Sequence, residues 1–196
     1  MGYMANLVVE GRDALVVGGG KIAARKVEDL LAAGARVTVV APDICDEIDR
    51  VAERVRLHRR PYQPHDIGDS LVVIAATDDE ELNAQVSRDC VARNVLVNVV
   101  DRPALCTFTV PATVHRGDLT IAIATNGRCP AFASILREEL EGRYGAEYGP
   151  LLDRFEQVRR RMVADRETGP RIRETIAKLY RERSASELEQ PRGLGE

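Results

Sequence analysis

The 196-residue sequence predicts an α/β fold in which helices cover both faces of a parallel β-sheet. Short runs of Val, Ile, Leu and Ala, which are typical of strands buried on both faces, alternate with segments of helical period. Aromatic residues make up only 4% of the chain, so aliphatic side chains must form the core. A glycine-rich turn at residues 18–20 connects a strand directly to a helix. Together these features are typical of a Rossmann-type nucleotide-binding fold.

The first hundred residues follow a β-α-β order. Residues 7–9 and 13–17 are predicted to form two strands around a turn. Apolar side chains at helical spacing then predict a helix at residues 22–33, which Gly34 ends as a C-terminal cap. The pattern continues with a strand at 36–41, a short helix at 44–52, a short strand at 55–58, an apolar strand at 71–76, a helix at 78–94 and a strand at 96–100.

A different pattern begins after residue 106. Residues 107–115 and 119–124 alternate between polar and apolar side chains around a turn at Gly117, which predicts a β-hairpin. A helix is expected from Pro130 to about residue 140, and the chain is charged and helical in period from residue 148 onward. Its apolar residues there form two stripes: Leu151, Leu152, Phe155 and Val158, then Ile172, Ile176 and Leu179. The last dozen residues, rich in Ser, Glu, Pro and Gly, are predicted to be disordered.

Composition narrows the class of partner. The formal net charge of -3 argues against nucleic acid, because phosphate binding needs a basic excess. No apolar run approaches the length of a membrane span, and the first ten residues lack the basic and apolar segments of a secretory signal. The cysteines are widely spaced, without a C-x-x-C pair: Cys45, Cys90, Cys106 and Cys129. They predict reduced thiols in a cytoplasmic protein rather than disulfides or a zinc site.

The turn between the first long strand and the first helix predicts a dinucleotide site. It reads Gly18-x-Gly20-x-x-Ala23. Gly18 permits the tight turn, Gly20 lets the backbone approach a pyrophosphate, and Ala23 keeps the helix close to the strand. Lys21 and Ile22 lie at the start of the helix, whose amides and dipole would hold the anion.

The residues after the next strands bear on which cofactor binds. An acidic residue usually ends the second strand and contacts the ribose, but here Pro42 and Asp43 lie just beyond its end. Asp43 is compatible with ribose contact or with capping the next helix. No Arg beside it suits a 2'-phosphate, so NAD is favoured over NADP. Thr77 and Asp78 are compatible with cofactor contact or with starting the following helix as N-caps.

The sequence resembles precorrin-2 dehydrogenases and the N-terminal half of siroheme synthases. The resemblance covers residues 7 to about 140, with the motifs in family order. They are the glycine loop at 16–26, Ala-Ala-Thr-Asp-Asp at 75–79, Asn-Val-Val-Asp at 98–101, F-x-x-P at 108–111, and the loop and helix at 124–131 and 136–140. Each motif alone is modest, but few Rossmann families combine them with a hairpin after the last strand.

This resemblance implies NAD-dependent oxidation of precorrin-2 to sirohydrochlorin on the way to siroheme. Some members of the family also insert ferrous iron at the same site. The implied organisation is an NAD-binding Rossmann domain at 1–112, a dimerisation region at 113–145 that forms a homodimer, and a helical domain at 146–196. The helical domain would cover the tetrapyrrole and end in the disordered tail. No uroporphyrinogen methyltransferase domain is expected after residue 196.

The resemblance also maps the family's essential acidic residue onto Asp101. A carboxylate there could accept the proton that leaves the substrate, whereas the alternative is a turn or capping role. The substrate carries eight carboxylates, which need local cations, and the candidates near the motif loops are Arg102, Arg128, Arg116 and Arg137. Thr125 keeps a hydroxyl where some members have Ser, whereas Cys129 does not.

Other polar residues are assigned structural or surface roles. Asn98 is expected to be a structural polar group, and His115 a surface residue, because it lacks partners at the spacing of a metal site. The run at residues 159–161, three arginines, is expected to be a solvated helix face that could also close over substrate carboxylates.

Two other functions fit the glycine loop. An NAD(H)-sensing regulatory module, such as those gating potassium channels, would normally carry an acidic residue at the end of the second strand and lack the F-x-x-P hairpin. A short-chain dehydrogenase would need a Tyr-x-x-x-Lys pair, which the sequence does not contain.

Overall fold

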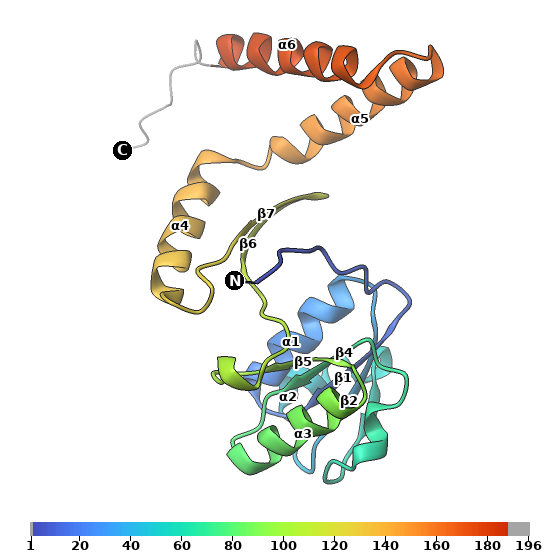
Figure 1. Ribbon diagram of the computed structural model, residues 1–196, viewed down its shortest axis with the longest axis vertical. Coiled ribbons are helices and arrows are strands. Elements are labelled where there is room, and N and C mark those ends of the chain that lie inside the picture. Colours follow the sequence, from blue (N-terminus) through green and yellow to red (C-terminus); the bar gives the residue numbers. More distant parts are fainter. Residues whose placement is uncertain (1, 188–196) are drawn as a thin grey trace. The chain divides into compact units, whose positions relative to one another are not determined.

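The computed structural model describes residues 2–187. The chain divides into two compact units, Met1–Val110 and Pro111–Glu196, and each is described separately below (Figure 1).

The first unit contains a five-stranded sheet in the order β3-β2-β1-β4-β5. All of its strands are parallel. Their bounds are β1 (Asp13–Val17), β2 (Arg36–Val40), β3 (Arg56–His58), β4 (Val72–Ala75) and β5 (Leu96–Val99). The predicted α/β fold with a parallel sheet is confirmed. Because the chain runs outward from β1 to β2 and then returns to β4 on its other side, the topology reverses between β1 and β4, which is where such sheets bind ligands.

Helices cover both faces of this sheet (Figure 1). Helices α1 (Lys21–Ala32) and α2 (Asp46–Asp49) pack on one face, where they share a core with Ala14 and Val16 of β1. Helix α3 (Glu80–Ala92) packs on the other face with Leu15 and Val17. Successive residues of β1 therefore enter different cores, which explains why the strand is apolar throughout. Three short 3-10 helices complete the unit: η1 (Ala52–Arg54), η2 (Pro64–Ile67) and η3 (Pro103–Leu105).

The predicted strand at residues 7–9 is wrong. Both edges of β1 are already paired, with β2 and β4, so the preceding segment has no open edge there to join. Val9 still anchors this segment in the core, whereas Val8 is 75% exposed.

The ends of two helices test the capping predictions. Gly34 has φ +79 and donates its N–H to the Leu31 carbonyl, so the predicted C-terminal cap of α1 is confirmed. The prediction that Thr77 or Asp78 starts α3 is wrong. The carboxylate of Asp79 accepts the first free N–H groups of that helix, because the Thr77 hydroxyl is bonded to Asn83 instead.

The second unit begins with the predicted hairpin. Strands β6 (Ala112–Arg116) and β7 (Leu119–Ile123) pair in antiparallel fashion around Gly117, whose φ is +59. The first hairpin strand was expected to begin at residue 107. It begins later because Thr107 bonds to β5 instead, donating its N–H to the Val97 carbonyl at 2.8 Å.

Three helices follow the hairpin: α4 (Pro130–Arg143), α5 (Tyr148–Ala164) and α6 (Gly169–Glu187). The two predicted apolar stripes belong to α5 and α6, and the chain turns between them at Arg166, with φ +58. Residues 185–187 of the predicted disordered tail are helical, and its remaining residues, 188–196, lie outside the described residues. Across residues 2–187, no helix has the length and apolar character needed to cross a bilayer.

Candidate active site

A cleft of about 1080 Å³ lies in the first unit at the carboxyl ends of β1, β2, β4 and β5. Segments that follow these strands line it: residues 17–22, 40–45, 61–62, 76–80, 82–83 and 100–102. The structure therefore gathers one set of sequence-predicted residues around one space: Gly18, Gly20, Lys21, Ile22, Pro42, Asp43, Thr77, Asp101 and Arg102. Ala23 is fully buried in the core beneath the loop, where its small side chain lets α1 approach the sheet.

The glycine loop fits a pyrophosphate. Gly18 has φ +126, and a Cβ there would overlap the Ala76 carbonyl oxygen. A Cβ on Gly20 would meet nothing within 4 Å, so the space before this residue is open to a ligand. Gly20 is also the N-cap of α1, with no side-chain cap and no acidic residue in the first turn. The first N–H groups of the helix are therefore free to bind an anion.

Gly19 has a structural role that the sequence analysis did not assign. A Cβ on Gly19 would overlap the Asp43 carbonyl oxygen, and the Gly19 carbonyl accepts the Cys45 N–H at 2.8 Å. The loop after β2 is thereby held against the glycine loop. The signal in the sequence was the third consecutive glycine, since the dinucleotide motif itself requires only the two on either side.

The two roles left open for Asp43 can be compared with the structure. Helix α2 begins after Cys45 and has no side-chain cap, so Asp43 does not cap it. Its side chain is exposed in the cleft. The two arginines that follow β3 are engaged elsewhere. Arg59 pairs with Asp49, and Arg60 donates to the Asp66 carboxylate at 2.8 Å and to the Pro61 carbonyl at 3.0 Å. Among the lining residues, Lys21 and Arg102 are the cations.

Thr77 lies at the end of β4, with its hydroxyl already engaged. It donates to Asn83 Oδ1 at 2.9 Å and accepts the Asp79 N–H at 3.2 Å. Asn83 was missed by the sequence analysis, although it is only 5% exposed. The sequence did contain a signal for it, because Asn83 lies one turn before Val86 on the buried face of the predicted helix.

Asp101 follows β5 in an unusual backbone conformation. Its φ is +57, and the turn is closed by the Arg102 N–H donating to the Val99 carbonyl at 3.2 Å. Asp tolerates this left-handed region better than most residues. Among residues 2–182, whose side chains the structure describes, the Asp101 carboxylate has no hydrogen-bond partner, so it caps no helix there. It is an exposed acid in the same cleft as the glycine loop.

The candidate substrate-binding arginines differ in how they are engaged. Arg102 forms an ion pair with Glu80 at the start of α3. Arg116 stabilises the end of α4, because it donates to the carbonyls of Tyr144 and Glu141 at 2.7 and 3.0 Å. Arg137 pairs with Glu141 at 2.6 Å. The last two are thus occupied by contacts within the second unit.

Thr125 and Arg128 belong to the second unit, in the loop before α4. The Thr125 hydroxyl accepts the Cys129 N–H at 3.3 Å, and Arg128 is exposed. Asn98 donates to the Phe108 carbonyl at 3.1 Å, which confirms its structural role. His115 is exposed, as expected, and its ring lies 3.0 Å from the Thr120 hydroxyl.

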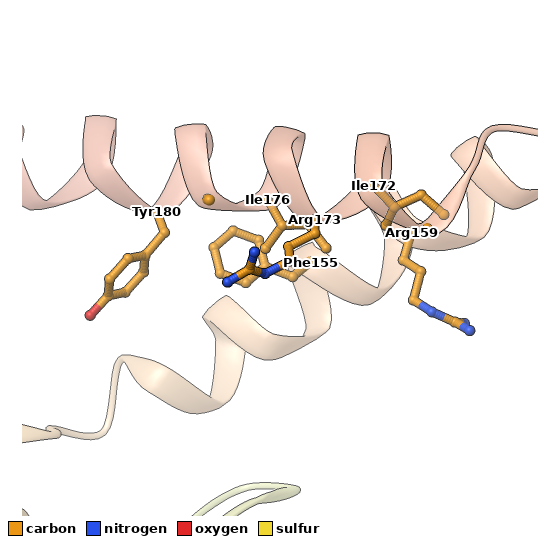
Figure 2. Close-up of a pocket in the computed structure, with 8 residues that line it drawn as sticks. Phe155, Arg159, Ile172, Arg173, Ile176 and Tyr180 are labelled. Atoms are coloured by element: carbon orange, nitrogen blue, oxygen red, sulfur yellow. The ribbon is translucent and has the colours of Figure 1, made fainter.

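A second cavity lies in the other unit. It is a groove of about 580 Å³ between α5 and α6, lined by Phe155, Ile172, Ile176 and Tyr180 with Arg159 and Arg173. Figure 2 shows Phe155 and Ile176 in the space between the two helices. Arg159 belongs to the predicted arginine run, all of which is exposed on α5. Residues of both predicted apolar stripes line this groove: Phe155 from the first, and Ile172 and Ile176 from the second.

Two family models match the chain. A model of NAD(P)-binding proteins matches residues 5–112, and a model of the sirohaem biosynthesis protein central region matches residues 116–143.

Individual relatives agree with these matches. The chain is 45% identical over 156 residues to a siroheme synthase of Pseudomonas aeruginosa (strain LESB58), which covers 79% of this chain and 34% of the relative. It is 47% identical over 142 residues to a siroheme synthase of Methylobacillus flagellatus, covering 71% and 30%. The chain thus spans about a third of the length of the curated relatives it matches. Among solved structures it is similar to SirC, precorrin-2 dehydrogenase, with a TM-score of 0.76 and 28% identity over 90% of this chain and 88% of that one.

Proposed function

Because the chain belongs to the precorrin-2 dehydrogenase and siroheme synthase family of NAD(P)-binding proteins, we propose that it oxidises precorrin-2 to sirohydrochlorin with NAD+. The observation that carries the proposal is the position of Asp101. Its exposed carboxylate follows β5 and lies in the same cleft as the glycine loop, and this cleft includes the point between β1 and β4 where the sheet reverses its topology. A hydride acceptor and a proton acceptor can therefore meet at one substrate.

NAD fits the residues that line this cleft. Gly18 and Gly20 leave room for a pyrophosphate, and the N–H groups at the start of α1, including those of Lys21 and Ile22, would bind it. Asp43 is exposed where a ribose hydroxyl would need an acceptor, and Thr77 lines the opposite wall. Two arginines follow β3, and both are paired: Arg59 with Asp49 and Arg60 with Asp66. Neither is free for a 2'-phosphate, which favours NAD over NADP. When bound, NAD+ supplies the acceptor for the hydride that leaves precorrin-2.

Asp101 is the group we propose as the proton acceptor. The oxidation removes two hydrogens from precorrin-2, one as a hydride and one as a proton, so a base must take the proton. The left-handed turn holds Asp101 at the cleft with its carboxylate unpartnered among the described residues. Arg102 is the cation in the cleft that we propose for a substrate carboxylate. To bind it, Arg102 would have to release Glu80, its partner in an exposed ion pair. Thr125 and Arg128 are proposed to contact the same substrate.

The second unit is proposed to make the protein a homodimer. Phe132 and Ile135 on α4 are 51% and 59% exposed, which leaves an apolar face on the helix that packs against the hairpin. Pairing of two copies through residues 113–145 would bury this face. We propose that residues 1–112 form the NAD-binding domain and that the C-terminal domain predicted at 146–196, whose described part is helical, contributes to tetrapyrrole binding.

Insertion of ferrous iron into sirohydrochlorin is a second reaction that we propose for the same cleft. Two pyrrole protons must leave when the metal enters, and Asp101 would accept them one at a time and pass each to solvent. We also place the protein in the cytoplasm, since its four cysteines are free thiols. The net charge of -3 offers no basic excess for a nucleic-acid partner, and we propose neither a nucleic-acid nor a membrane partner.

The test is an anaerobic assay with precorrin-2 and NAD+. We expect one NADH to form for each sirohydrochlorin seen in the visible spectrum, with less product when NADP+ replaces NAD+. An NAD(H)-sensing module would bind NADH but form none from precorrin-2, and that result would contradict the proposal.

A further inference from the structure

Asn83 is a buried polar residue that the proposed reaction does not use. Within the part of the chain whose side chains are described, the buried polar residues are Asn83 and Ser87. Both are 5% exposed, and they lie about one turn apart on α3. A buried amide is costly unless its donor and acceptor are both bonded, so the partners of Asn83 indicate what it is for.

The hydrogen bonds of the Asn83 side chain all lead to one residue, Thr77. Asn83 Nδ2 donates to the Thr77 carbonyl at 2.8 Å. Asn83 Oδ1 accepts the Thr77 N–H at 3.3 Å and the Thr77 hydroxyl at 2.9 Å. The side-chain amide thus satisfies both backbone polar groups of Thr77. Because β4 ends at Ala75, Asn83 does for Thr77 what a neighbouring strand would do.

This contact bears on the glycine loop through Ala76. The Ala76 N–H donates to the Val17 carbonyl at 2.8 Å. The Ala76 carbonyl oxygen occupies the space that a side chain on Gly18 would need. Residues 76 and 77 therefore form the wall against which the loop rests, and Thr77 also lines the cleft. A shift at Thr77 would move both the wall and the loop.

We propose that Asn83 is a positioning residue of the nucleotide site: it holds Thr77, and through Ala76 the glycine loop, in the geometry that binds NAD. This inference rests on the proposed NAD-dependent function. Asn83 acts through Thr77 and is assigned no direct contact with the reacting atoms. Its removal is expected to weaken NAD binding while leaving the chemical step intact.

Ser87 provides a matched control. It has the same exposure on the same helix and makes one side-chain hydrogen bond, from its hydroxyl to the Leu105 carbonyl at 2.7 Å. That bond leads to η3 and not to Thr77. Ser87→Ala therefore reports the effect of losing a buried hydrogen bond from α3 without disturbing the end of β4.

The experiment titrates NAD+ into the full-length wild type, Asn83→Leu and Ser87→Ala by calorimetry, well below their melting temperatures. Leu has the branching and nearly the size of Asn but makes no hydrogen bond. We expect Asn83→Leu to bind NAD+ about tenfold more weakly, the scale of one to two lost hydrogen bonds. Ser87→Ala should bind as the wild type does. In turnover, Asn83→Leu should raise the KM for NAD+ and keep kcat at saturating NAD+.

The outcomes separate this inference from the function on which it rests. A wild type that does not bind NAD+ overturns the proposed function and this inference with it. Two other results overturn the inference alone, provided that the wild type binds NAD+. In the first, Asn83→Leu binds NAD+ as tightly as the wild type does. In the second, Asn83→Leu and Ser87→Ala lose the same amount of affinity. If Asn83→Leu does not fold, Asn83→Ser replaces the amide with a shorter hydroxyl that cannot bond both backbone polar groups of Thr77. An unchanged affinity in that variant overturns the inference as well.

Discussion

The carbonyl oxygen of Ala76 fills the position that a Cβ on Gly18 would occupy. Two strands that are far apart in sequence but adjacent in the sheet, β1 and β4, thus meet at their carboxyl ends with no room for a side chain. The glycine loop starts from this contact, so its geometry depends on the backbone of β4 as well as on its own sequence.

Gly18→Ala is expected to destabilise the protein by roughly 1–3 kcal/mol or more, because it adds a clash with rigid backbone to an unfavourable left-handed φ. Chemical denaturation of the variant and the wild type measures the difference. Equal stability would show that the backbone at the end of β4 can move away, and this would contradict the role of Ala76 and Thr77 as a rigid support for the glycine loop.

Gly20→Val, unlike Gly18→Ala, should leave stability nearly unchanged and affect cofactor binding instead. Nothing lies within 4 Å of a Cβ at Gly20, so the fold has room for the side chain and the melting temperature should barely change. The valine would occupy the place of the pyrophosphate and should abolish the binding of NAD+ and NADP+. Calorimetry checks this, and retained binding would place the cofactor elsewhere.

The sequence predicted the parallel sheet because strands buried on both faces must be continuously apolar, as the two cores around β1 require. It predicted the C-terminal cap of α1 because a helix end often needs a left-handed residue, which glycine adopts easily, and Gly34 has that conformation. It failed at residues 7–9, since an apolar run does not reveal whether a neighbouring edge is free. It also missed Asn83, because only the fold shows that this polar side chain faces the end of β4.

Stability at low pH should depend on Asp66. The hydrogen bond from Arg60 lowers the pKa of the Asp66 carboxyl below its ordinary value of 3.8, with the Gln63 N–H as a further donor. The ionised form is favoured in the folded state, so its contribution is present above about pH 3.8 and is lost as the pH falls through the lowered folded pKa.

Asp66→Asn is therefore expected to cost about 1–3 kcal/mol at neutral pH, the scale of hydrogen bonds to a charged group, since the Asp66 side chain is only 4% exposed. The difference from the wild type should shrink as the pH falls below about 3.8. Urea unfolding at a series of pH values measures it. A difference that stays constant with pH would show that the charge contributes nothing.

The proposed homodimer predicts a specific effect of Phe132→Asp. This change places a charge on the apolar face of α4 and should convert the dimer to a monomer in sedimentation at micromolar concentration. Val163→Asp is the control, because Val163 is similarly exposed at 50% but lies on α5. A wild type that sediments as a monomer, or a dimer lost equally in both variants, would contradict the proposed interface.

The last prediction concerns Asp101 and separates catalysis from turn formation. Asn and Gly both tolerate the left-handed φ of +57, so Asp101→Asn and Asp101→Gly should fold and bind NAD+ as the wild type does. If Asp101 accepts the substrate proton, both variants should lose turnover by roughly 10²- to 10⁴-fold, as is typical for a positioned base. If the residue serves only the turn, Gly suits that conformation at least as well and turnover should be unchanged. Anaerobic assays that follow NADH formation decide between these results, and near-normal turnover of Asp101→Gly would remove Asp101 from the chemistry.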